Sequence, residues 1–466
     1  MGVVTDMSQE LDLLIRAGRV HGHDGLVDVH IRNGLVVAVE PTPPVPAGNG
    51  QAGDDRTGDG QAGDGRATAA PAEAREVLDA GGGLVSRSFT EPHYHPDKAY
   101  SRRLAPRGMA DGFARARAIK AGFTVPDVTE RALRALRLAS ANGVTALRAN
   151  VDVDSVSGLT GLHGVLAARE RVAHLMDVQI VAFPQEGLLR DPLSRSLLAE
   201  ALRSGAGLVG GWPNVEEGPE AQRAHVREVF DLAERFGADV DLHLDCEIDA
   251  TETMLEFTAA ETVRRGYQGR VVASHCCGLE VYDDADAARV VAAVAEADVR
   301  VVVVPLNLVD GGPRGLSRPR QLAEAGVVVA AGSDNLNDGW YALGTLDPMD
   351  RAQTAFLGAG YHDEGALDTA WDLVCGQAAA AIGGRPGDLA VGEAADLVVF
   401  DVPDRATALA GVPGHRTTLR RGRVVGRRDT TGTTAYGPIG LTAALSGAGT
   451  PGGTGSGRSA REQVSA

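Results

Sequence analysis

Eight short runs of apolar residues recur along the chain, and they limit the folds available to it more than any other feature does. The runs lie at residues 84–89, 144–147, 178–183, 207–211, 240–244, 271–273, 299–304 and 327–331. Continuous apolar runs of this length are typical of strands that are buried on both faces of a parallel sheet. Each run therefore predicts one strand of such a sheet.

Stretches of helical length, rich in alanine, leucine, arginine and glutamate, lie between most of these runs. The clearest covers residues 127–142, and Pro126 before it and Gly143 after it are usual start and stop signals of a helix. Others cover residues 218–236, 251–266 and 284–297. Alternating strands and helices predict an α/β fold, and eight such units predict a closed (β/α)8 TIM-like barrel. No Gly-x-Gly-x-x-Gly motif follows the first run, which argues against a dinucleotide-binding sheet.

The two ends of the chain predict a second, smaller β unit. Short strands are expected at residues 11–16, 27–32 and 35–40 near the start, and at 396–400, 417–420 and 423–425 near the end. Asn33-Gly34 and Arg421-Gly422 supply the tight turns of two hairpins. Because chain ends usually lie close together, we expect these strands to form one β-sandwich.

These elements also divide the chain. We expect residues 1–80 and 390–428 to form the two halves of the sandwich, and residues 81–389 to form the barrel. Residues 41–75 are rich in proline, glycine, alanine and aspartate and contain a repeated Gly-Gln-Ala-Gly-Asp motif. Because this insert and the glycine-rich tail at 429–466 have no apolar face, both are predicted to be disordered.

The charge and composition of the chain exclude several classes of protein. Its formal net charge of -17 at pH 7 is unfavourable for binding nucleic acid or an anionic membrane surface. No stretch has the length of apolar sequence that a membrane span needs, and residues 1–10 do not resemble a signal peptide. The four cysteines indicate no disulfide framework. We therefore expect a cytoplasmic protein, and its association into a homo-oligomer stays open.

Histidines and an aspartate follow several of the predicted strands. His93 and His95 are one residue apart, so in an extended strand both imidazoles point to one face and could bind one metal ion. His243, His275 and Asp334 each follow a later run. Because barrel enzymes carry their active sites at the C-terminal ends of the strands, this combination predicts a metallohydrolase site.

Six short motifs, in order along the chain, make the sequence similar to the cytosine deaminase branch of the amidohydrolase superfamily. They are Glu91-Pro92-His93-Tyr94-His95-Pro96-Asp97-Lys98, residues 177–187, Asp241-Leu242-His243-Leu244-Asp245, Ala273-Ser274-His275, Gly332-Ser333-Asp334 and residues 340–345. The Asp97-Lys98 pair resembles the N-isopropylammelide aminohydrolase-like members of that branch. The resemblance extends from the first sandwich strands to about Arg423.

The resemblance implies a role for each residue of the site. Four residues would hold one divalent ion, either zinc or iron(II): His93, His95, His243 and Asp334. Asp334 would also accept a proton, and His275 would stabilise the attacking hydroxide or the charge that develops at the attacked carbon. Gln185 and Trp340 would bind a small heterocyclic substrate, the first through its amide and the second by covering the ring.

Some residues depart from the pattern of that branch. Where the family has a glutamate, three residues after the third histidine ligand, this chain has Cys246, and Glu247 follows it. A thiol is a poor substitute for a carboxylic acid that transfers protons. Either Glu247 takes over this catalytic role, which is the assignment that we choose, or another group transfers the proton, or the original chemistry is lost. Ser333 and Asn335 replace the residues that flank the metal aspartate in cytosine deaminase, so we expect a substrate other than cytosine.

The sequence therefore predicts a metal-dependent hydrolase that cleaves a C–N bond of a small nitrogen heterocycle and releases ammonia or an amine. Two alternatives stay open. One is hydrolysis of a cyclic amide or imide at the same metal centre. The other is a non-catalytic member of the family, and only the presence of Cys246 supports this alternative.

Overall fold

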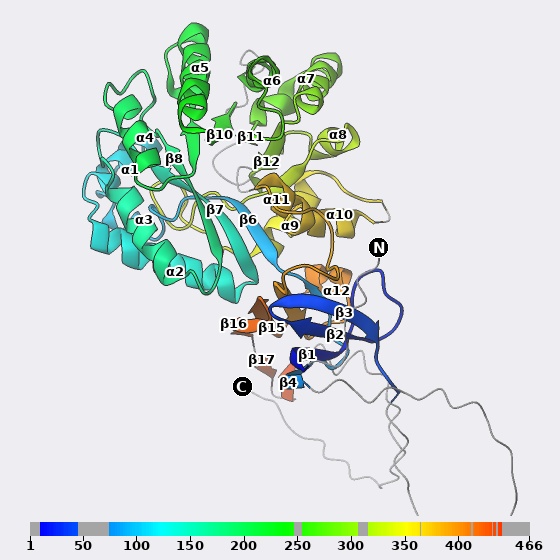
Figure 1. Cartoon of the computed structure of the whole chain (residues 1–466). Helices are drawn as coiled ribbons and strands as arrows, with labels where there is room; N and C mark the ends of the chain where they lie inside the picture. The colour runs from blue at the N-terminus through cyan, green and yellow to red at the C-terminus, as the bar shows by residue number, and fades with distance from the viewer. Residues whose placement is uncertain are drawn as a thin grey trace, which may run out of the picture.

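Eight parallel strands form the centre of the molecule (Figure 1). The structure, a computed structural model, describes residues 10–44, 74–246, 254–305, 316–363, 365–411 and 413–430, and the backbone of 432–434 and 437–439. The strands are β6 (Phe89–Tyr94), β7 (Val144–Asp152), β8 (Asp177–Phe183), β9 (Leu208–Gly211), β10 (Asp239–Leu244), β11 (Val271–His275), β12 (Arg300–Val303) and β13 (Val329–Ala331). They pair in the order of the sequence, and a parallel bridge between Tyr94 and Asp334 joins the two ends of the sheet. The sheet is the predicted (β/α)8 barrel.

Helices alternate with the barrel strands and surround them (Figure 1). They are α1 (Gly112–Lys120), α2 (Val125–Ala141), α3 (Thr160–Arg171), α4 (Ser194–Arg203), α5 (Pro219–Phe236), α6 (Met254–Arg265), α7 (Asp284–Glu296), α8 (Pro319–Glu324), α9 (Pro348–Gly358), α10 (Ala366–Asp372) and α11 (Gly376–Ala381), with short 3-10 turns η1 (Arg102–Leu104), η2 (Pro213–Val215) and η3 (Cys277–Val281). A further helix, α12 (Arg405–Ala410), comes later in the chain, after the barrel strands and their helices, and contacts α9 and α10.

Local signals explain where the predicted helices begin and end. The side chain of Thr124 accepts a hydrogen bond from the amide of Asp127 and so caps α2. Gly143, with φ of 98°, follows its C-terminal end. The helices predicted at 218–236, 251–266 and 284–297 correspond to α5, α6 and α7, although residues 251–253 lie outside the described ones.

Strands from the two chain ends form two four-stranded sheets, with orders β3-β2-β1-β4 and β16-β15-β14-β5. The strands are β1 (Leu11–Gly18), β2 (Val27–Arg32), β3 (Leu35–Pro41), β4 (Ala74–Asp79), β5 (Val85–Arg87), β14 (Leu397–Phe400), β15 (His415–Arg420) and β16 (Arg423–Asp429). Ile15 and Ile31 of one sheet and Leu397 of the other belong to one cluster of buried apolar residues. The two ends of the chain therefore meet in one small β unit beside the barrel (Figure 1).

The structure differs from the sequence prediction where the chain passes from this unit into the barrel. The run at 84–89 was expected to be one barrel strand, but β5 pairs with β14 in the small unit and the barrel strand begins at Phe89. The amide of Ser88 donates to the carbonyl of Asp396 and the next amide, of Phe89, donates to Gly143. One apolar run thus contributes to strands of two different sheets. A single run covers both because each of these strands is mostly buried.

The segments predicted to be disordered lie mostly outside the described residues, which omit 45–73 and 440–466. At the edge of the insert, β4 pairs in parallel with β1. Within the tail, β17 (Gly432–Thr434) and β18 (Gly437–Ile439) form a short antiparallel pair that the composition did not predict.

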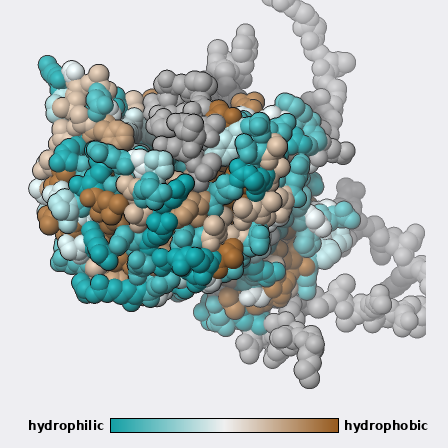
Figure 2. All heavy atoms as spheres, turned by 90° about the horizontal axis from the view of Figure 1, so that it is seen from above, coloured by the Kyte–Doolittle hydropathy of each residue, from teal (hydrophilic) through white to brown (hydrophobic). Residues whose placement is uncertain are grey.

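The face shown in Figure 2 is covered mainly by hydrophilic side chains, with apolar ones scattered among them. This agrees with the formal net charge of -17. Across the described ranges, no helix combines the length and the apolar character needed to cross a membrane.

Candidate active site

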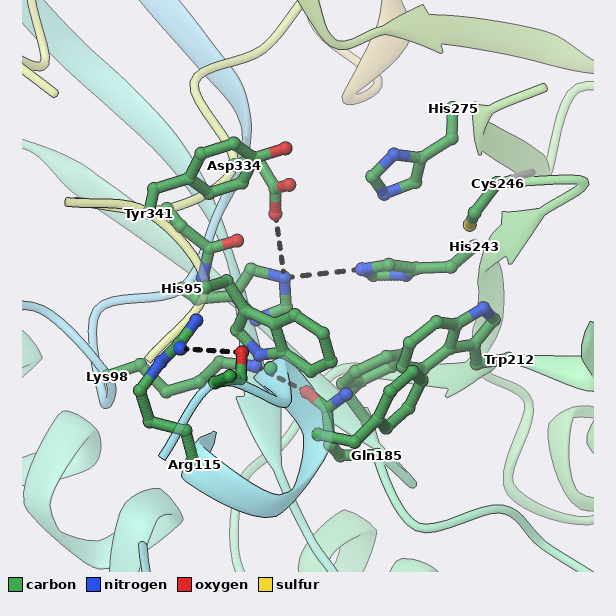
Figure 3. Close-up of a pocket in the computed structure, with 16 residues that line it drawn as sticks. His95, Lys98, Arg115, Gln185, Trp212, His243, Cys246, His275, Asp334 and Tyr341 are labelled. Carbon is green, nitrogen blue, oxygen red and sulfur yellow. Dashed lines mark hydrogen bonds and ion pairs between the residues drawn. The ribbon is translucent and has the colours of Figure 1, made fainter. Parts of the chain in front are cut away.

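Three histidines and one aspartate from three strands meet at the C-terminal end of the barrel. His93 lies in β6 with His95 just after it, His243 lies in β10, and Asp334 follows β13. Their ligand atoms all lie within 4.8 Å of one another. The Nε2 atom of His95 is 3.2 Å from Nε2 of His243 and 3.2 Å from Oδ1 of Asp334 (Figure 3). The structure thus brings the four predicted metal ligands together.

The spacing and chemistry of these groups fit a divalent cation. Two atoms bound to zinc at about 2.0–2.1 Å in tetrahedral geometry stand roughly 3.3 Å apart. The distances from His95 to His243 and Asp334 are close to this value. Among the described residues, the buried Nε2 atom of His93 has no hydrogen-bond partner, and Oδ1 of Asp334 is 3.6 Å away. A cation between these atoms would bind the lone pairs of the imidazole nitrogens and of the Asp334 oxygen, which otherwise face one another.

Burial controls the ionisation of the cluster. Burial, and then the charge of Lys98, lowers the pKa of His95 to about 4. Burial, reinforced by the neighbouring imidazoles, also holds the pKa of His243 well below its ordinary value. Burial alone would raise the pKa of Asp334, but its interactions with His93 and His95 outweigh this and hold it well below the usual range. His95 and His243 are therefore neutral imidazoles and Asp334 is a carboxylate at neutral pH, the forms that bind metal ions.

Glu91, a site residue that the sequence prediction missed, connects the strands that carry the ligands. Its carboxylate accepts hydrogen bonds from the amide of His93 (3.1 Å) and from the amide and hydroxyl of Ser333 (3.0 and 2.5 Å). Because Ser333 precedes Asp334, Glu91 ties β6 to the segment after β13. On another side, Nδ2 of Asn150 is 3.3 Å from Nδ1 of His93. A glutamate placed between an apolar run and His-x-His was the available signal.

His275 faces the cluster from the end of β11 (Figure 3). Its φ is 72° and that of Asp334 is 63°. Such left-handed conformations are uncommon for residues other than glycine, and they concentrate at functional sites. The ring centroid of His275 is 5.0 Å from that of His243. The strained turn thus directs the predicted catalytic histidine toward the candidate metal ligands.

A cavity of about 350 Å³ opens beside the cluster. Besides His95, His243, His275 and Asp334, its lining includes five aromatic side chains, those of Phe113, Phe183, Trp212, Trp340 and Tyr341. Phe113 stacks on Trp212 with ring centroids 5.3 Å apart and 13° between the planes, and it meets Trp340 edge-on at 4.8 Å. Much of the cavity wall is therefore aromatic, which suits a planar ring. Of these aromatic residues, only Trp340 was predicted.

A buried histidine on α5 holds the backbone of Trp212. Nε2 of His225 accepts a hydrogen bond from the amide of Trp212 at 3.1 Å, and its Nδ1 is 2.8 Å from Oε1 of Glu216. The same Glu216 oxygen accepts from the amides of Leu188 and Leu189. This buried pair therefore fixes two loops beside the cavity.

Gln185, predicted to bind substrate, lines the cavity in a fixed orientation. The ammonium of Lys98 donates to Oε1 of Gln185 at 2.6 Å and to Oδ1 of Asp152 at 2.9 Å. Since Oε1 is occupied, the amide NH2 group of Gln185 remains as the donor toward the cavity. Burial disfavours the charge of Lys98, but Asp152 and Asp97 outweigh this and raise its pKa. Lys98 is thus charged, and it fixes the orientation of Gln185. Neighbouring carboxylates balance its charge.

Cys246 lines the same cavity, whereas Glu247 lies outside the described residues. Burial raises the pKa of the Cys246 thiol well above its ordinary value. At neutral pH this position therefore presents a protonated thiol, where the resemblance described above implied a glutamate.

Asn335 and Asp338 shape the loop that carries Trp340. Nδ2 of Asn335 donates to Oδ2 of Asp338 at 2.6 Å. The other oxygen of Asp338 accepts from the amides of Trp340 and Tyr341 at 2.8 and 3.0 Å. Asn335, which departs from the cytosine deaminase pattern, therefore helps to position Trp340 in the wall of the cavity.

Together the barrel and the buried histidine–aspartate cluster at its C-terminal end define the class of metal-dependent hydrolases. A model of the amidohydrolase family matches residues 76–425. The chain belongs to the amidohydrolase family, and it is a hydrolase of carbon–nitrogen bonds.

Individual relatives resemble most of the chain. A pterin deaminase from Rhizobium rhizogenes is 33% identical over 376 residues, which cover 77% of this chain and 84% of that protein. An N-isopropylammelide isopropyl amidohydrolase from a Pseudomonas species is 25% identical over 442 residues, 90% of this chain and 98% of that one. The crystal structure of 5-methylcytosine deaminase from Klebsiella pneumoniae, liganded with phosphonocytosine, has a TM-score of 0.77 at 27% identity. That match covers 90% of this chain and 98% of the deaminase.

Proposed function

We propose that this chain releases ammonia or an amine from a small, planar nitrogen heterocycle by hydrolysis. The observation that carries the proposal is the histidine–aspartate cluster beside a cavity. The wall of this cavity is largely aromatic and also contains the side-chain amide of Gln185. The volume of about 350 Å³ lies at the lower end of small-molecule sites, about 300–1,000 Å³. The relatives described above are named as a pterin deaminase, a 5-methylcytosine deaminase and an N-isopropylammelide isopropyl amidohydrolase, and each of these names specifies a nitrogen heterocycle.

The cofactor in this proposal is one divalent ion, zinc or iron(II), since imidazole and carboxylate ligands suit both. Its ligands would be His93, His95, His243 and Asp334. When bound, such an ion would lower the pKa of a water molecule well below its value in bulk water and would thereby supply a nucleophile at neutral pH.

The side chains of the chain itself would transfer the protons. Oδ1 of Asp334 faces the histidines, so its Oδ2 would accept the proton of the attacking water. His275 would donate a hydrogen bond to the attacking oxygen or to the charge that develops at the attacked carbon. Glu247, which follows the cavity residue Cys246, would deliver a proton to the leaving nitrogen.

Gln185 and Trp340 would orient the ring. The NH2 group of Gln185 would donate to a carbonyl oxygen or an unprotonated nitrogen of the substrate, because its own oxygen is held by Lys98. Trp340 would cover one face of the ring, close to the side chain of Phe113. A bound ring would in this way be held by one directional contact and by stacking.

Metal content is the first test of the proposal. Protein purified without chelator should contain one divalent ion per chain, and a chelator should abolish a turnover that zinc or iron(II) restores. His243→Ala should lose the ion, whereas His163→Ala, at an exposed position on α3, should retain it. A metal-free protein whose Tm does not rise with either ion would contradict the assignment of the four ligands.

The second test is the product formed from a panel of pterins, pyrimidines and N-alkylated triazines. Release of ammonia or amine supports the proposal. Opening of the ring without such release would establish the cyclic amide hydrolase instead. A metal-loaded protein that converts none of these rings would overturn the proposed reaction.

A further inference from the structure

Two cationic side chains line the cavity, Lys98 and Arg115, and their charges are balanced differently. Lys98 contacts the carboxylate of Asp152 at 2.9 Å, and both groups are buried. Arg117, two residues after Arg115, forms an ion pair with Glu186. Arg115 makes no ion pair within the described ranges. It is therefore the one cation of the described cavity lining whose charge is not neutralised by the protein.

Backbone carbonyl groups hold the guanidinium of Arg115 in place. Its Nε donates to the carbonyl of Gly339 at 2.5 Å, and its Nη1 donates to those of Met109 and Ala110 at 3.1 and 3.2 Å. These contacts orient the group without cancelling its charge. They also leave the Nη2 atom without a hydrogen bond to any described residue. A half-buried guanidinium held in this way is preorganised to bind an anion.

The Nη2 atom of Arg115 lies near Trp340, in the wall of the cavity. A Cβ built on Gly112 would be 3.8 Å from Nη2 of Arg115 and 3.4 Å from the ring of Trp340. In Figure 3, Arg115 lies on the opposite side of the cavity from His243 and His275. A group bound by Arg115 would therefore belong to the end of the substrate that is remote from the attacked bond.

We propose that Arg115 forms an anion subsite that recognises a carboxylate on the distal end of the heterocycle. The inference rests on the proposed function and narrows its substrate class to carboxylated rings. A single unbalanced cation matches the single charge of a carboxylate, whereas a phosphate dianion would leave negative charge unpaired. In a chain with a formal net charge of -17, such a local cation also offsets the repulsion that an anionic substrate meets.

The test compares two substrates of one shape, a pterin that carries a carboxylate on its second ring and the corresponding carboxamide. The readout is the ratio of their kcat/KM values in the metal-loaded enzyme. Wild type should favour the carboxylate by about 10- to 100-fold, the range expected for hydrogen bonds to a charged group. Arg115→Gln should bring the ratio close to one, and Arg115→Lys should retain part of it. Arg117→Gln, the matched control, should keep the wild-type ratio.

Equilibrium binding separates this inference from the reaction itself. Quenching of tryptophan fluorescence gives a Kd for each ring whether or not it is converted, since Trp212 and Trp340 line the cavity. If neither ring is hydrolysed but wild type still prefers the carboxylate and Arg115→Gln does not, the subsite stands and the proposed reaction fails. A wild-type ratio near one overturns the subsite. So does a folded Arg115→Gln protein, checked by circular dichroism, that keeps the preference. If that variant does not fold, loss of preference in Arg115→Lys relative to Arg117→Gln supports the subsite, and an unchanged ratio overturns it.

Discussion

The proposed transfer of a proton to the leaving group can be tested at two residues, Cys246 and Glu247. Glu247→Gln should lower kcat by about 10² or more, as for a lost general acid or base, and should leave the metal content unchanged. Cys246→Ala should be mild, because a buried, protonated thiol does not exchange protons readily at neutral pH. Steady-state kinetics with a metal assay on each variant makes the comparison.

The opposite pattern, with Cys246→Ala inactive and Glu247→Gln active, would place the thiol in the mechanism. If neither variant loses turnover, the transfer belongs to another group, with Asp334 and His275 the first to examine. A loss of metal from Glu247→Gln would point to a structural role instead.

The candidate metal ligands could be predicted from sequence because each has a distinctive residue type at a distinctive place. His93 and His95 share one strand face, and His243 ends another strand. Phe113 and Trp212 could not be predicted in the same way. Aromatic side chains are common in cores, and only the folded chain stacks these two at 5.3 Å, from the start of α1 and the end of β9.

Among the elements, β6 and the segment after β13 close the barrel, and Glu91 is their main side-chain link. Glu91→Gln replaces a carboxylate that accepts three hydrogen bonds with an amide whose NH2 group must face one of the donors. We expect metal affinity to fall by about 10- to 100-fold, as for other residues that orient metal ligands. Chelator competition gives the affinity, and the Tm of the metal-free protein reports the change in stability.

Glu130→Gln is the matched control, because Glu130 pairs with Arg171 at the surface of α2 with 68% of its side chain exposed. It should change neither quantity measurably. Equal metal affinities in the two variants would show that the hydrogen bonds of Glu91 do not position the ligands.

Most elements could be predicted, since apolar runs, helical periodicity and caps are local signals. The passage from β5 to β6 could not, because a strand buried in the small β unit and a strand buried in the barrel have the same composition. The left-handed turns at His275 and Asp334 were also hidden from sequence. Residues other than glycine adopt them only when the surrounding structure requires it.

At the scale of the whole molecule, a group of charges that includes the buried side chains of Arg416 and Asp347 joins the small β unit to the barrel. Arg416 of β15 donates to Oδ1 of Asp347 at 2.8 Å, and Arg428 of β16 pairs with the other oxygen. Asp347 caps α9, and Arg428 also donates to the side chain of Asn142 at the end of α2. The sequence predicted that the chain ends come together. It could not predict this contact, since its partners lie 69 or more positions apart.

Asp347→Asn tests how strongly this contact holds the two parts together. Asparagine can still cap α9 but leaves Arg416, which is 3% exposed, without a counter-charge. Loss of one partner of a buried pair costs about 3–5 kcal/mol. Asp79→Asn, which removes a pair with both side chains 55% exposed, should cost at most about 1 kcal/mol. Urea unfolding of both variants measures the difference, and metal content should stay at the wild-type value because Asp347 touches no candidate ligand. Equal midpoints for the two variants would mean that apolar packing alone joins the small β unit to the barrel.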